Sequence, residues 1–251
     1  MIDDPNFYLA AIPAVLLYGI AKGGFAGGFG IVAVPMMALV IPPAQAAAIM
    51  LPILLIMDLA AIWAYRRSWD AGLIKLLLPA SLVGMAIGAA GFRYLTPDAI
   101  RLALGLMAIG FVLYRWAAHA PGAAPAPRSV AKGWFWGTLS GLTGFVAHAG
   151  SPPLQVYLLP LRLAPALLVG TVAVLFAGLN WAKVIPYWWL GLFSAQNVVT
   201  AAALVPVGVA GVWIGVWVRR RIAERVFYGL IYAFLLLTGL KLCYDGLRAV
   251  T

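Results

Sequence analysis

The sequence has few of the side chains with which soluble proteins do chemistry. Its 251 residues include one cysteine, two histidines and seven acidic residues, and only 10% of the residues are charged. The single cysteine, Cys243, excludes a disulfide framework and cysteine-based metal sites. The few carboxylates argue against a cage for a divalent cation, and neither H-E-x-x-H nor G-x-x-x-x-G-K-[ST] occurs. We therefore expect no metal site, no cofactor and no enzymatic activity.

Hydrophobic residues dominate what is present. They make up 65% of the chain, against about 45–50% in soluble domains. Apolar runs of about 20 residues, the length that spans a bilayer as a helix, recur along the chain. They cover residues 44–65, 73–92, 99–118, 163–186, 197–218 and 226–244. The sequence thus predicts an all-α polytopic membrane protein.

The net charge of +10 has a simple origin in such a protein. Lys and Arg collect at the ends of the apolar runs, as the positive-inside rule predicts for cytoplasmic loops. We therefore expect the lipid bilayer, and not nucleic acid, as the partner of this charge. The N-terminus "MIDDPN" is acidic, so residues 7–21 are predicted to be mature structure and not a signal peptide.

The chain divides into two similar halves. The segment "RWAAHAPGAAPAPRSVAK" (115–132) is the only long non-spanning stretch rich in Pro, Ala and Gly, so we expect a linker there. A displacement of 118 residues carries Gly19, Gly23 and Pro35 onto Gly137, Gly141 and Pro153. A displacement of 127 carries Pro79, Gly84 and Gly88 onto Pro206, Gly211 and Gly215. We predict a repeat at 1–118, a cytoplasmic linker at 119–131 and a second repeat at 132–251.

Loop charges indicate that the repeats are inverted. Arg66 and Arg67 follow the first full span, whereas the equivalent loop "WWLGLFSAQ" of the second half is uncharged. One loop later the second half is the richer in arginine, with Arg219, Arg220, Arg221 and Arg225. Equivalent loops then face opposite sides of the membrane. Each half is predicted to hold a broken segment, re-entrant or fully spanning, and three transmembrane helices. That gives 8 to 10 membrane segments in a bacterial inner membrane, with both termini periplasmic.

A break near the start of each half predicts the binding site. The breaks read "AKGGFAGGFGIVAVP" (21–35) and "GLTGFVAHAGSPPLQ" (141–155). Irregular backbone at membrane depth is tolerated where it lines a cavity, and paired breaks of this kind mark transporter sites. We expect Ser151 to cap a half-helix whose open amides, near Leu154 and Gln155, face an anion. Gly27, Gly28 and Gly30 would let the first break approach the same anion.

Polar residues inside the spans complete the predicted site. Lys22 and Lys183 are each either anion ligands or cations that reach the membrane interface. Asn180 lies on the same helix face as Lys183 but cannot reach the membrane interface, so it needs a hydrogen-bond partner inside the protein. Asp58 is a candidate for proton coupling or the partner of Lys22 or Arg66. His148 is a ligand, a proton carrier or a satisfied polar group. The predicted substrate-binding residues are Lys22, Gly27, Gly28, Gly30, His148, Gly150, Ser151, Gln155, Asn180 and Lys183.

Three stretches resemble signatures of the sulfite exporter TauE/SafE family, also called the toluene-sulfonate uptake permease family. They are "KGGFAGGFGIVAVPMM", "HAGSPPLQVYLLPLRL" and "GTVAVLFAGLNWAKVIPYWWLG", and the likeness covers residues 8–246. The chain has Gly150-Ser151-Pro152-Pro153 where the family commonly has Gly-Gly-Pro-Pro. The resemblance implies a secondary transporter, often an exporter, of sulfite, sulfoacetate or other organosulfonates. An anion channel, a carrier of carboxylates and a homodimer stay open as alternatives.

Overall fold

The computed structural model describes residues 1–27, 30–92, 94, 96–117, 126–219, 221, 236–237 and 239–248, and within these ranges it contains helices and no strands. Most of the linker predicted at 119–131 and most of the apolar run 226–244 lie outside the described residues. Five of the described helices are long and apolar enough to cross a membrane. They are α1 (Pro5–Gly24), α3 (Pro43–Tyr65), α4 (Ala71–Phe92), α8 (Pro165–Trp189) and α9 (Ala195–Val218). The predicted helical membrane bundle is confirmed.

Most of the remaining helices are short or lie beside the two breaks. The short 3₁₀ helix Gly30–Val32 and α2 (Ala33–Ala38) follow the first break, and α5 (Pro97–Ala117) precedes the predicted linker. α6 (Val130–Ala147) leads into the second break, which α7 (Ser151–Leu158) and a 3₁₀ turn at Leu159–Leu161 follow. Both predicted interruptions are therefore present in the helical structure.

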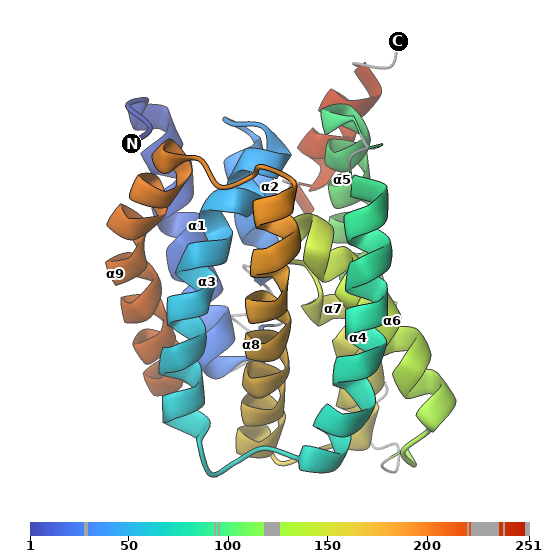
Figure 1. Cartoon of the computed structure of the whole chain (residues 1–251). Coiled ribbons are helices and arrows are strands. Elements are labelled where there is room, and N and C mark those ends of the chain that lie inside the picture. Colours follow the sequence, from blue (N-terminus) through green and yellow to red (C-terminus); the bar gives the residue numbers. More distant parts are fainter. Residues whose placement is uncertain are drawn as a thin grey trace.

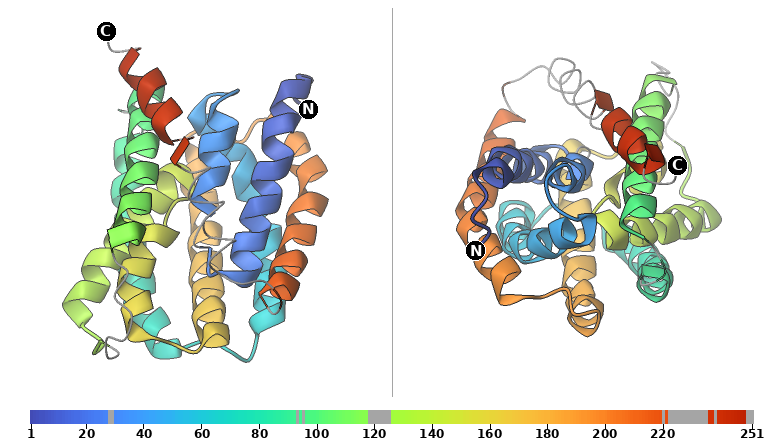
Figure 2. Two further views of the ribbon diagram at one scale, coloured as in Figure 1. Left: turned by 180° about the vertical axis from the view of Figure 1, so that it is seen from behind. Right: turned by 90° about the horizontal axis from the view of Figure 1, so that it is seen from above.

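The long helices lie roughly parallel or antiparallel to one another, and the breaks lie inside the bundle (Figure 1). α1 starts at the face that carries the N-terminus and runs inward, and α2 returns toward that same face (Figure 2). α6 starts at the opposite face, and α7 turns back toward it after the second break. Each break is thus flanked by one long helix and one short helix of opposite direction.

Two closely packed helix pairs, α1 with α9 and α4 with α6, hold the bundle together. A Cβ atom added to Gly23 would lie 2.0 Å from the carbonyl oxygen of Val212, and one added to Gly84 would lie 1.8 Å from that of Thr138. The backbones therefore touch where glycine stands, as in small-residue contacts between membrane helices. Gly84 and Gly211, which contacts α1 at Gly19, therefore serve helix packing.

Replacement of Gly84 by alanine is expected to destabilise the protein by about 1–3 kcal/mol, because the new methyl group meets backbone that cannot rotate away. Gly91 in the same helix is the matched control, since a Cβ there would meet nothing within 4 Å. Thermal unfolding of the purified variants in detergent measures the difference. Equal melting temperatures for Gly84→Ala and Gly91→Ala would contradict the packing described here.

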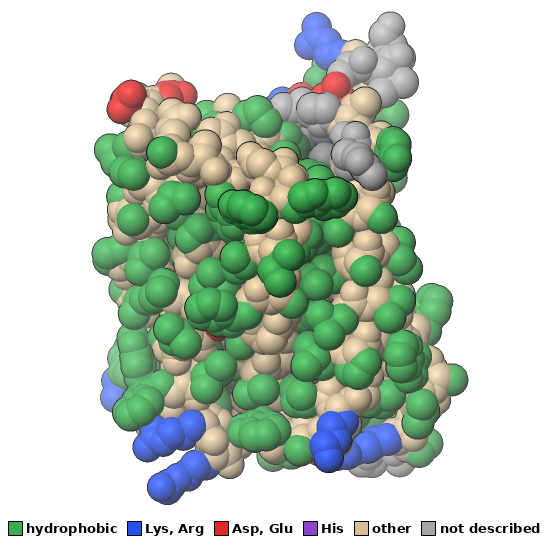
Figure 3. All heavy atoms as spheres, viewed as in Figure 1, with side chains coloured by type: hydrophobic (Ala, Val, Ile, Leu, Met, Phe, Trp, Pro, Cys, Tyr) green, Lys and Arg blue, Asp and Glu red, His purple; other side chains and the backbone are tan. Residues whose placement is uncertain are grey.

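Basic side chains mark the face opposite the N-terminus, which we call the basic face. The end of α3, the starts of α4 and α6 and the end of α9 meet there, and Figure 3 shows Lys and Arg along that edge. Its described basic residues are Arg66, Arg67, Lys75, Arg128, Lys132, Arg162, Arg219 and Arg221. On the side that Figure 3 shows, hydrophobic side chains cover the surface between this face and the other.

Asp70 ties three helices together at the basic face. Its carboxylate accepts from the backbone amide of Leu73 at 2.9 Å and pairs with Arg128 at 2.5 Å. Its own amide donates to the hydroxyl of Thr171 in α8 at 2.9 Å. The amide of Leu73 first, and then the Arg128 guanidinium, hold the pKa of the Asp70 carboxyl below its usual value.

Candidate functional site: two breaks and a buried charge network

The two breaks have similar backbone turns. Ala26 and His148 both have φ of 52°, in the left-handed region, and Gly27 follows Ala26 with φ of 69°. In each turn an amide donates to a carbonyl six residues earlier, from Gly27 to Ala21 at 2.9 Å and from Ala149 to Thr143 at 3.3 Å. These bonds satisfy carbonyls that the helix ends would otherwise leave open. The buried irregular backbone of each break thus forms a hydrogen bond to the helix that precedes it.

The breaks contact each other directly. The Ser151 hydroxyl donates to the carbonyl of Ala26 at 2.9 Å. The Gln155 side-chain amide donates to the same carbonyl and to Ser151 Oγ, both at 3.4 Å. Ser151 and Gln155 are each only 5% exposed. The first half therefore supplies a carbonyl acceptor, and the second half supplies the polar side chains that close on it.

The predicted cap of α7 was wrong. Gly150 occupies the cap position, without a side-chain bond, and Ser151 is the first helical residue. The two prolines that follow have no N–H group, and the amide of Leu154 donates to the Gly150 carbonyl at 3.4 Å. Only Gly150 and Ser151 can offer amides at this helix end. An anion there would depend on side chains more than the sequence suggested.

The first break also uses its amides internally. The amide of Gly30 donates to the Gly27 carbonyl at 3.0 Å, in addition to the bond from Gly27 to Ala21. A Cβ at Gly30 would lie 2.9 Å from the ring of Tyr18, so this glycine packs against α1. Gly28 lies outside the described residues. The amides of Gly27 and Gly30 therefore both have backbone partners in this structure.

A continuous chain of buried polar side chains connects the two halves. Lys22 Nζ forms an ion pair with Asp58 Oδ1 at 2.6 Å. Asn180 Nδ2 donates to Asp58 Oδ2 at 2.8 Å, and Lys183 Nζ donates to Asn180 Oδ1 at 3.0 Å. These four side chains are between 0% and 5% exposed. Of the two partners predicted for Asp58, the structure selects Lys22, while Arg66 stacks on Trp63 at 4.6 Å.

His148 is the last member of this row of buried polar side chains and lies at the second break. Its Nε2 lies 2.9 Å from the carbonyl of Ala47, which can only accept, so Nε2 carries a proton. We assign its Nδ1 as the acceptor of a bond from Lys183 Nζ at 3.2 Å, which makes the ring neutral. Lys183 thus contacts an amide oxygen and an imidazole nitrogen. No carboxylate among the described residues forms an ion pair with it.

Three contributors to the site were not predicted. Tyr18 donates to the carbonyl of His148 at 3.2 Å, and the Lys22 ammonium lies 5.9 Å from its ring centre. Ser140 donates to the carbonyl of Gly150 at 2.6 Å and so anchors the second break. The ring of Phe176 packs against Gly150. The spacing of four residues between Tyr18 and Lys22 places them on one helix face and could have indicated the first of these.

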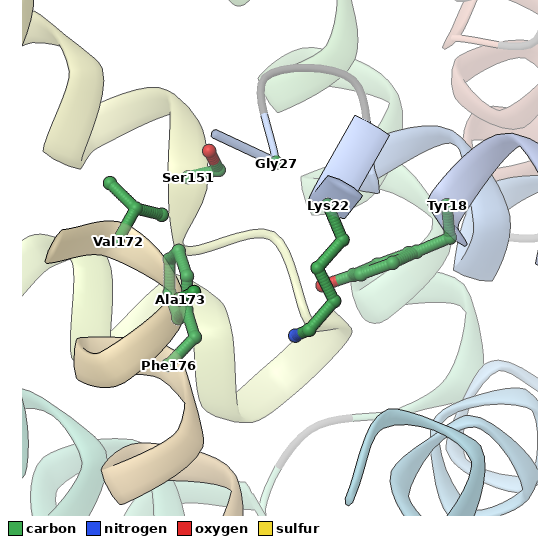
Figure 4. A pocket seen from close by; sticks show the side chains of 7 residues that line it. All are labelled: Tyr18, Lys22, Gly27, Ser151, Val172, Ala173 and Phe176. Carbon is green, nitrogen blue, oxygen red and sulfur yellow. The ribbon is translucent and has the colours of Figure 1, made fainter. Parts of the chain in front are cut away.

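A small cavity lies between the breaks (Figure 4). It is about 10 Å³ in volume, just enough for one water molecule. In Figure 4 the aliphatic and aromatic residues of α8 face Lys22 and Tyr18 across it. Its lining residues are Tyr18, Lys22, Gly27, Ser151, Val172, Ala173 and Phe176. An anion with several oxygen atoms would need the two breaks to move apart.

Long apolar helices around a buried network of charged and amide side chains define an integral membrane protein whose polar residues face the bundle interior. The chain belongs to the sulfite exporter TauE/SafE family, whose family model matches residues 11–242. No curated protein and no solved structure matches it. The resemblance seen in the sequence motifs is thereby confirmed.

Proposed function

We propose that the protein is a secondary transporter of small sulfur-containing anions, such as sulfite, sulfoacetate or other organosulfonates. The family is one of sulfite exporters. The single observation that carries the proposal within this chain is the buried ammonium of Lys183, 3% exposed and without a carboxylate partner among the described residues. A buried ammonium without an ion-pair partner is costly even when it is hydrogen-bonded, and an anion that reaches it offsets part of that cost.

The two buried lysines then have different roles. Lys22 is neutralised by Asp58, so it supports the site and contributes no net charge. Lys183 adds the uncompensated positive charge, beside His148 and the second break. Ser151, Gln155 and Asn180, together with the amides at Gly150 and Ser151, would supply hydrogen bonds once the breaks separate. Gly27 would allow the backbone to approach closely.

An inverted-repeat relation between residues 1–118 and 132–251, joined by the linker at 119–131, fits the packing. Asp58 and Asn180 occupy the same place in α3 and α8, counted from Pro43 and Pro165, and they bond to each other. On this relation α6 is the counterpart of α1, and α9 is the counterpart of α4. The packing of α1 on α9 is then equivalent to the packing of α6 on α4. On this relation we propose alternating access by rocking one repeat against the other.

The basic face gives the orientation that we propose. Lys and Arg concentrate in cytoplasmic loops, so this face would be cytoplasmic and the N-terminus periplasmic in a bacterial inner membrane. Tags at the N-terminus and in the linker, probed with an impermeant reagent in intact cells, test this. A linker tag that reacts in intact cells would contradict it.

A binding screen on the purified protein tests the proposed function. Sulfite, sulfoacetate, taurine, sulfate and simple carboxylates should be compared by isothermal titration calorimetry, and we expect the sulfur anions to bind most tightly. In proteoliposomes, saturable uptake and counterflow of the best ligand would distinguish a carrier from an anion channel. Absence of binding by every anion, or preference for carboxylates, would overturn the proposed substrate class.

A further inference from the structure

A second, larger cavity opens beside the basic face. It is about 180 Å³ in volume, far more than the roughly 10 Å³ of the central cavity. The end of α1, the first break, α7, the start of α8 and the end of α9 enclose it. Phe25, Leu168 and Val169 give it apolar walls, and Arg219 and Gln155 supply its polar side chains. We call this cavity the vestibule.

Arg219 is held in place by an aromatic side chain. Its guanidinium carbon lies 5.7 Å from the ring centre of Tyr65, and its Nη1 donates to the Tyr65 hydroxyl at 3.5 Å. That hydroxyl in turn donates to the carbonyl of Gly23 at 2.7 Å, at the end of α1. Stacking on a ring leaves guanidinium N–H groups able to bind an anion. Arg219 forms no ion pair with another described residue.

The vestibule and the central cavity share a wall. Ala26 and Gln155 line the vestibule, whereas Gly27 and Ser151 line the central cavity. The hydrogen bonds from Ser151 and Gln155 to the Ala26 carbonyl run through this wall. Among the described residues, the turn at Ala26 and Gly27 and the side chains of Ser151 and Gln155 therefore lie between the two spaces.

We infer that the vestibule is an outer anion site, with Arg219 as its cation, and that the bonds of Ser151 and Gln155 to Ala26 form the gate to the central site. This inference rests on the proposed function for the identity of the anion. An anion held at Arg219 lies next to Gln155, whose amide can turn from the Ala26 carbonyl to the anion. Loss of that bond leaves Ser151 as the main remaining contact across the gate.

Thiol labelling in detergent tests the outer site without requiring transport. Leu168→Cys, in a Cys243→Ser background, places one cysteine in the vestibule. We expect an anionic methanethiosulfonate to react faster than a cationic one, and Arg219→Gln to lower this rate ratio by about tenfold. Arg66→Gln is the matched control, because Arg66 is on the same face but stacks outside the vestibule on Trp63. Arg219→Lys should retain most of the ratio.

Sulfoacetate is the ligand for a protection experiment, since sulfite would itself cleave the mixed disulfide. It should slow labelling of Leu168→Cys, and this protection should be lost with Arg219→Gln but kept with Arg66→Gln. An unreactive cysteine, or a rate ratio that Arg219→Gln leaves unchanged, would overturn the inference. Normal labelling and a normal Arg219 effect in a protein that transports no anion would instead refute only the proposed function.

Discussion

Replacement of Lys183 by methionine is expected to reduce the affinity for the transported anion by about 100-fold or more. Loss of one partner of a buried charge pair costs about 2–5 kcal/mol, and about 2.7 kcal/mol corresponds to a factor of 100. The substitution stabilises the fold by removing an uncompensated buried charge. It destabilises the fold by removing the hydrogen bonds to Asn180 and His148, so we expect the fold to survive. These two effects on stability oppose each other.

Calorimetric titration and thermal unfolding of the same preparation separate binding from folding. Lys75→Met is the control, because Lys75 is an exposed cation of the basic face. A Lys183→Met protein that binds the best anion as tightly as the wild type would show that Lys183 does not carry the charge of the site. A variant with a melting temperature close to that of the wild type and no measurable binding would support the assignment.

Replacement of Asp58 by leucine is expected to destabilise the protein by about 3–5 kcal/mol, since it leaves Lys22 buried without its counter-ion. The double variant Lys22→Met/Asp58→Leu should recover most of this loss, because neither partner then remains charged. Thermal or denaturant unfolding of the two single variants and the double variant completes the cycle. A double variant no more stable than Asp58→Leu would show that the ion pair is not the reason for the loss.

The same double variant tests the proposed coupling role of Asp58. If Asp58 carries the coupling proton, the folded double variant should still exchange anion across liposomes but should no longer accumulate it in response to a pH gradient. Gradient-driven accumulation at the wild-type level would exclude Asp58 as the coupling group.

The sequence located the breaks but not their bonding. Gly27 and Ser151 stand out because glycine, proline and serine interrupt apolar runs, and such interruptions are visible in a single chain. The cap at Ser151 was wrong because local preference favours Ser at a helix start, whereas the two prolines that follow offer its hydroxyl no N–H group and the amide of Leu154 donates to the Gly150 carbonyl instead. The partners of the Gly27 and Gly30 amides depend likewise on the turn that forms, and glycine spacing alone does not reveal them.

The charge network shows the same limit. The spacing of three residues predicted that Asn180 and Lys183 lie on one helix face, and they do contact each other. It also offered Lys22 and Arg66 as partners of Asp58, and only the arrangement of α1 beside α3 decides between them. The bond from Asn180 to Asp58 joins residues 122 positions apart, and no local periodicity could predict it.

The contact between Asp58 and Asn180 bears on how the protein arose. On the proposed relation between the halves, a dimer of two identical half-length chains would place the same residue on both sides of this contact. Two aspartates so close could not both ionise, and two asparagines would give Lys22 no counter-ion. Fusion into one chain removes this restriction, because each copy can then change separately. A carboxylate facing an amide requires two copies that differ in sequence, and the two halves of one fused chain meet that requirement.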